Sequence, residues 1–67
     1  MDKFKDRRRI KHLILVEWLR SRSRTSTDVN QIHAYDMAAH YVRAAFSEEI
    51  EAEHKINMRD NIIKYEI

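Results

Sequence analysis

The 67-residue sequence contains neither glycine nor proline. These two residues are the strongest local markers of turns, so the ends of helices and strands have to be inferred from capping residues and from changes in hydrophobic period. Cysteine is also absent, which excludes disulfides and points to a reducing compartment. A chain this short buries only about 60% of its unfolded surface, so we expect packing to stabilise it, with a dimer interface as one source.

Apolar residues recur at helical spacing over two stretches. The first runs from Asp6 to about Arg20 and carries a wide apolar stripe, made of Ile10, Leu13, Ile14, Val16, Trp18 and Leu19. The second runs to about Glu53, with apolar positions at Ile32, Tyr35, Ala39, Val42, Phe46 and Ile50. Residues 21–28 between them are rich in hydroxyls and predict a connection that ends in an N-cap at Thr27 or Asp28. Asp36 is where a break inside the second stretch costs least, because aspartate tolerates the left-handed conformation.

The hydrophobic period changes after His54. From Ile63 to Ile67 apolar and charged residues alternate strictly, and Arg59, Asp60 and Asn61 supply turn chemistry. This pattern predicts a hairpin of residues 54–58 with 62–67. The expected fold class is therefore mainly α with a small C-terminal β-hairpin.

Positive charge is concentrated in the first third of the chain. Residues 1–24 carry nine Lys and Arg against three acids, whereas the remainder carries four against eight. Such clustering attracts phosphate backbones or acidic protein surfaces, although a charged run can also serve only to solvate a surface.

Two segments, Tyr41-Val42-Arg43-Ala44-Ala45-Phe46 and Ile50-Glu51-Ala52-Glu53-His54-Lys55-Ile56, resemble the recognition helix and the stretch before the wing of winged helix-turn-helix domains. The resemblance implies a three-helix winged domain over residues 9–67, behind a basic N-terminal arm at residues 1–8. It also implies a third helix that starts near Met37, lies in the major groove of DNA and contacts bases through His40 and Arg43.

Contacts to the DNA backbone would come from the basic first third, the start of the second helix and the wing. With the base-reading pair, the residues expected to bind DNA are Arg7, Arg8, Arg9, Lys11, Arg20, Arg22, Arg24, Thr27, Asn30, His40, Arg43, Arg59, Asn61 and Lys64. The first hypothesis is thus a small regulator of transcription or replication that binds double-stranded DNA as a homodimer.

A protein-interaction module is the alternative hypothesis. The same pattern fits a two-helix hairpin in which residues 28–54 are continuous and dimerise through the seam of Ile32, Tyr35, Ala39, Val42 and Phe46. An adaptor or a small viral inhibitor that binds an acidic surface of a host protein would look similar.

Other classes of function find little support in the residues. His33, Asp36 and His40, and separately Glu51 and His54, have spacings seen in metal sites, but three or four converging ligands are needed. The sequence has no nucleophile with a base and orienting group, and no glycine-rich phosphate loop. We therefore expect no enzyme activity, metal, cofactor or small-molecule substrate. The longest apolar run is residues 13–16, so we expect no membrane span and a cytoplasmic location.

Overall fold

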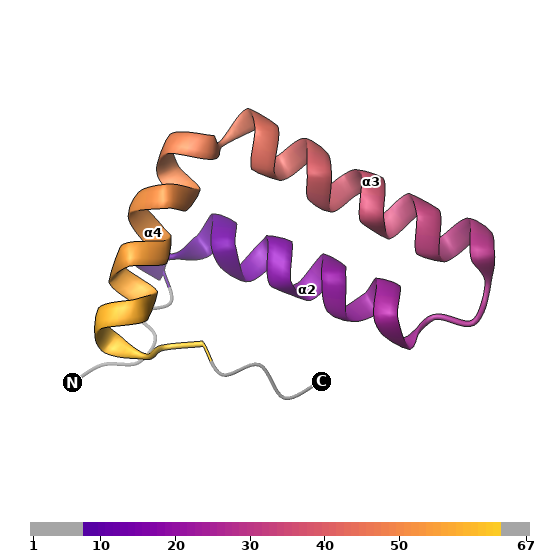
Figure 1. Ribbon diagram of the computed structural model, residues 1–67, viewed down its shortest axis with the longest axis horizontal. Coiled ribbons are helices and arrows are strands. Elements are labelled where there is room, and N and C mark those ends of the chain that lie inside the picture. Colours follow the sequence, from indigo (N-terminus) through magenta and orange to yellow (C-terminus); the bar gives the residue numbers. More distant parts are fainter. Residues whose placement is uncertain (1–7, 64–67) are drawn as a thin grey trace.

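The computed structural model describes residues 8–63, and three helices lie wholly within this range (Figure 1). They are α2 (Lys11–Thr25), α3 (Val29–Ala45) and α4 (Ser47–Asp60). α2 and α3 lie side by side as an antiparallel pair, and α4 turns across the end where α2 begins and α3 finishes (Figure 1).

The molecule is a single layer of helices. Its extents are 39 × 25 × 16 Å, and in the view down the shortest axis the three helices lie beside one another without overlapping (Figure 1). Each helix of the α2–α3 pair is therefore uncovered on two broad sides. This geometry limits the core to a narrow seam and leaves several large apolar side chains exposed.

The seam between α2 and α3 contains Val16, Leu19 and Ala39, with Tyr35 and Val42 packed against them. Farther along, the buried Ser23 Oγ donates a hydrogen bond to the carbonyl oxygen of Ile32 at 3.4 Å. The hydrophobic period of the sequence thus predicts the seam correctly, because these positions recur at threes and fours on each helix.

α4 is joined to the start of α2 by a buried carboxylate. The backbone N–H of His12 donates to Glu53 Oε1 at 2.9 Å, and His12 Nδ1 lies 3.1 Å from Glu53 Oε2. The residue before α2, Ile10, provides no side-chain cap, so Glu53 of α4 satisfies a free N–H group at this helix start. The His12 ring also stacks on Phe46, with 4.2 Å between ring centroids. These contacts set the position of α4.

The predicted C-terminal hairpin is wrong, and with it the winged-helix fold class. Residues 54–58 belong to α4, and no strand occurs between residues 8 and 63. The rest of the second predicted strand, residues 64–67, lies outside the described residues. Asn61 has φ 53°, the left-handed conformation that ends a helix, so the turn chemistry at 59–61 marks a helix C-terminus. Asn57 Oδ1 then accepts the N–H of Ile63 at 2.7 Å, which fixes the chain just after the helix.

The break in the second helical stretch also differs from the prediction. Asp36 is inside α3, and the chain breaks at Phe46, where φ is −123° and ψ is 37°. The helical stretch after residue 28 is therefore divided after Ala45. The break lets α4 turn back toward α2, where Phe46 and Glu53 both contact His12.

The predicted connection at 21–28 is shorter than expected. α2 continues to Thr25, whose Oγ1 donates to the carbonyl of Ser21 at 3.1 Å, so this hydroxyl remains compatible with the helix. Asp28 is the N-cap of α3 and accepts the N–H of Asn30 at 2.9 Å.

The predicted dimer seam is occupied within the chain. Ala39 is part of the core, and Tyr35 and Val42 pack against it. These side chains are therefore not available to a second copy unless the α2–α3 pair opens.

Candidate functional site

Four side chains of α2 form an exposed stripe along one side of the helix. They are spaced at i, i+4, i+7 and i+11, which places them within an arc of about 60° at 100° per residue. Its two middle members are apolar and poorly buried: Leu15 is 42% exposed and Trp18 is 53% exposed. Its ends are basic. We call this set the α2 stripe: Lys11, Leu15, Trp18 and Arg22.

Trp18 is held in a defined position although half of it is exposed. Its ring meets the Tyr35 ring of α3 edge to face, with centroids 6.2 Å apart and an interplanar angle of 86°. The guanidinium carbon of Arg22 lies 5.9 Å from the centroid of each of these two rings. An edge-to-face pair contributes about 0.5–1.5 kcal/mol and an exposed cation–π contact about 0.5–1 kcal/mol, enough to restrict the rotamers of all three side chains.

On the same broad side of the molecule as the α2 stripe, α3 presents uncharged residues. Tyr41 is 71% exposed and lies about 160° around α3 from Arg43, which is on the other broad side. The small residues Ala34 and Ala38 share the side of Tyr41 by their helical spacing. Together with the α2 stripe they form what we call the aromatic face: Lys11, Leu15, Trp18, Arg22, Ala34, Ala38 and Tyr41.

Electrostatically the aromatic face is purely basic within α2 and α3. The acids of these two helices are Glu17 and Asp36. Glu17 lines a groove on the opposite broad side, and Asp36 is two turns from Arg43 and shares its side of α3. The face therefore offers two cations at its α2 edge with no carboxylate of α2 or α3 to neutralise them.

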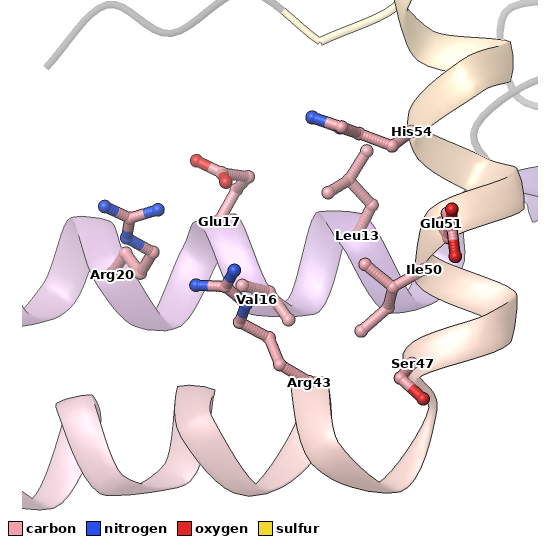
Figure 2. Close-up of a pocket in the computed structure, with 9 residues that line it drawn as sticks. All are labelled: Leu13, Val16, Glu17, Arg20, Arg43, Ser47, Ile50, Glu51 and His54. Carbon is pink, nitrogen blue, oxygen red and sulfur yellow. The ribbon is translucent and has the colours of Figure 1, made fainter.

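The groove on the opposite broad side has a volume of about 350 Å³. Figure 2 shows it in the corner where α2, the end of α3 and the start of α4 meet. Apolar side chains form its floor and charged ones its edge; the lining residues are Leu13, Val16, Glu17, Arg20, Arg43, Ser47, Ile50, Glu51 and His54. Its two arginines are matched by two glutamates, so the groove favours neither anions nor cations.

The basic residues predicted to bind DNA do not share a surface. Arg20 and Arg24 point about 150–170° away from the centre of the α2 stripe, which contains Lys11 and Arg22. Arg20 and Arg43 converge at the groove (Figure 2), and Arg9 lies close enough to Arg59 that both guanidinium charges lower the pKa of Asp60. The basic residues of α2, which are clustered in the sequence, therefore lie on two opposite sides of this helix.

The remaining predicted DNA contacts are scattered. Arg8, Thr27, Asn30 and His40 are exposed at separate places, from the start of the described chain to the middle of α3, whereas Arg9 lies near Asp60 and Arg59 at the end of α4. Arg7 and Lys64 lie outside the described residues.

Two of the three predicted wing residues, Arg59 and Asn61, instead finish α4. Asn61 is its left-handed C-cap, and Arg59 Nε donates to Asp60 Oδ1 at 3.0 Å. This hydrogen bond, with the nearby guanidinium charge, lowers the pKa of Asp60 below its usual 3.8.

Sequence reasoning missed the two most informative side chains. The sequence places Trp18 in the apolar stripe of residues 6–20, but this apolar stripe is wider than the seam, and Trp18 falls at its uncovered edge. The i, i+4, i+7, i+11 spacing of the α2 stripe was the available signal. For Glu53, the sequence gives no sign of its partner His12, which is 41 residues away.

Comparison of this chain with models of known protein families, with curated proteins and with solved structures found no match. Among residues 8–63 no group of three or more potential metal ligands converges. Nor does this part of the chain include a helix with the length and apolarity needed to span a membrane. Any functional assignment must therefore come from the geometry of the chain itself.

Proposed function

We propose that this chain is a small, non-enzymatic protein-interaction module that works in the cytoplasm and binds a partner protein through the aromatic face. The observation that carries the proposal is Trp18, which is 53% exposed yet positioned by Tyr35 and Arg22. Folding alone gives little reason to order a large apolar side chain at the surface.

The residue types of the aromatic face support binding to protein. Trp, Tyr and Arg are the residues that most often dominate the energy of protein–protein interfaces. Because Trp18, Tyr35 and Arg22 already contact one another, little side-chain entropy remains to be lost on binding.

The prediction of DNA binding depended on the winged-helix fold, which the structure contradicts. The wing is absent from the described residues, and His40 and Arg43 lie near the middle and end of α3, not at the start of a separate recognition helix. The basic side chains of α2 also point to opposite sides. Nucleic acid is therefore the competing outcome of the test.

The test is affinity capture with the tagged full-length chain, with and without nuclease. Trp18→Gln removes the aromatic side chain and keeps a good helix former. Met58→Gln is the matched control, because Met58 is 74% exposed and lies on α4, away from the aromatic face. Circular dichroism checks whether both variants keep the helical fold.

We expect the wild type and Met58→Gln to retain the same protein after nuclease treatment, and Trp18→Gln to lose it. Capture that disappears with nuclease, or that survives equally in Trp18→Gln, would contradict the proposal.

A further inference from the structure

We infer that the partner element is an amphipathic helix with a short apolar stretch between two acidic residues, lying along the α2 stripe. This inference rests on the proposed function and specifies what the aromatic face recognises. The observation behind it is the order of the stripe, in which two cations flank two apolar side chains: Lys11, Leu15, Trp18 and Arg22.

The spacing of the α2 stripe fits a helix. Lys11 and Arg22 are eleven residues apart, which is about three turns and about 16 Å along the axis of α2. The 4-3-4 spacing is also that of side chains that pack against a second helix in coiled coils and helix-in-groove complexes. A partner helix with the same spacing would place acids opposite both cations and apolar residues opposite Leu15 and Trp18.

The alanines of α3 leave space for this partner. Ala34 and Ala38 lie beside the α2 stripe on the aromatic face and have short side chains, so a helix packed on Trp18 can also approach α3. Tyr41, at 71% exposure, stands at the far edge of the face.

Charge decides between this partner and a second copy of the chain. In a symmetric dimer through the α2 stripe, basic ends would meet basic ends in either orientation: Lys11 opposite Lys11 and Arg22 opposite Arg22, or Lys11 opposite Arg22. No carboxylate of α2 or α3 lies on this side to relieve the repulsion. An acid-ended helix has the complementary charges at both positions.

The test uses intrinsic fluorescence, because Trp18 is the only tryptophan of the chain and belongs to the stripe. The probe is a synthetic helical peptide of alanine and glutamine, without aromatic residues. It carries leucines four and seven residues after a first glutamate, and a second glutamate eleven residues after the first. A second peptide has lysine in place of both glutamates and is otherwise identical.

We expect the acid-ended peptide to shift the Trp18 emission to shorter wavelength with saturation, and the lysine-ended peptide to bind about tenfold more weakly, because two attractive charge pairs become repulsive. The double variant Lys11→Glu with Arg22→Glu should reverse this preference. Arg20→Glu with Arg24→Glu makes the same change of charge on the opposite side of α2, and should keep the wild-type preference.

Each other outcome overturns the inference. Equal binding of the two peptides, or no emission shift with either, would exclude an acid-ended helix as the partner. The capture experiment with Trp18→Gln would still test separately whether the aromatic face binds a protein. A concentration-dependent dimer in sedimentation that buries Trp18 would assign the face to a second copy. Binding of duplex DNA that both double variants weaken equally would favour a general polyanion site.

Discussion

Replacement of Glu53 by alanine should destabilise the protein more than any other single loss of an acid in α4. Glu53 is only 5% exposed and its two carboxylate oxygens contact the N–H and the ring of His12. A helix cap contributes about 0.5–2 kcal/mol and a hydrogen bond to a charged group about 1.5–3 kcal/mol, so we expect a loss of about 2–4 kcal/mol. The stability of a domain this size is about 3–10 kcal/mol, so the variant would lose a large share of its free energy of unfolding.

Urea unfolding followed by circular dichroism measures this loss. Glu53→Gln should lose roughly half as much as Glu53→Ala, because the amide oxygen can still accept the N–H of His12. Glu51→Ala is the control: Glu51 is an exposed acid on the same helix, and its loss should change stability by less than about 0.5 kcal/mol. If Glu53→Ala unfolds at the same urea concentration as Glu51→Ala, the carboxylate does not join α4 to α2 as described.

Three further predictions concern the end of α4. Asn61→Ala should cost about 1 kcal/mol and Asn61→Gly should not, because Asn61 is left-handed; the comparison of their unfolding midpoints checks this. Asn57→Ala should remove the acceptor of the Ile63 N–H, cost about 1–3 kcal/mol and abolish the hydrogen-exchange protection of that amide, whereas unchanged protection would refute the contact. Arg59→Gln should raise the pKa of Asp60 toward 3.8 in a carboxyl NMR titration, since the guanidinium hydrogen bond lowers it. In the wild type this pair stabilises the fold above the unfolded pKa, and the contribution is lost as the pH falls through the lowered pKa; an unchanged titration in Arg59→Gln would contradict this.

The helices of the seam could be predicted because their signal is local and periodic. Val16, Leu19 and Ala39 recur at threes and fours with their neighbours, and Asp28 is a strong N-cap residue. Both features depend on residues within a few positions along the chain.

The C-terminal segment shows why local chemistry can mislead. Asn61 favours the left-handed conformation, and this preference serves a hairpin turn and a helix C-cap equally well. The alternation over residues 63–67 is too short to decide between them. The difference is made by Glu53 and Asn57, whose partners His12 and Ile63 favour a helix over residues 47–60.

The candidate site could not be predicted because it depends on which sides of the helices stay uncovered. Periodicity assigns Trp18 to the apolar stripe of α2, but the stripe is wider than one neighbouring helix can cover. Only the arrangement of the helices side by side in one layer shows that Leu15 and Trp18 remain exposed (Figure 1). In the same way, a count of charges shows that the first third of the chain is basic. Helix geometry then places the basic residues of α2 on two opposite sides of that helix.

Site-specific photo-crosslinking inside cells tests most directly whether proteins meet this chain at the aromatic face. A benzophenone amino acid would replace Leu15, which is 42% exposed in the α2 stripe, or Met58, which is 74% exposed on α4. We predict a discrete protein adduct from position 15 and none from position 58. Adducts of equal yield at both positions, or at position 58 alone, would show that the surface around Trp18 is not the one that binds.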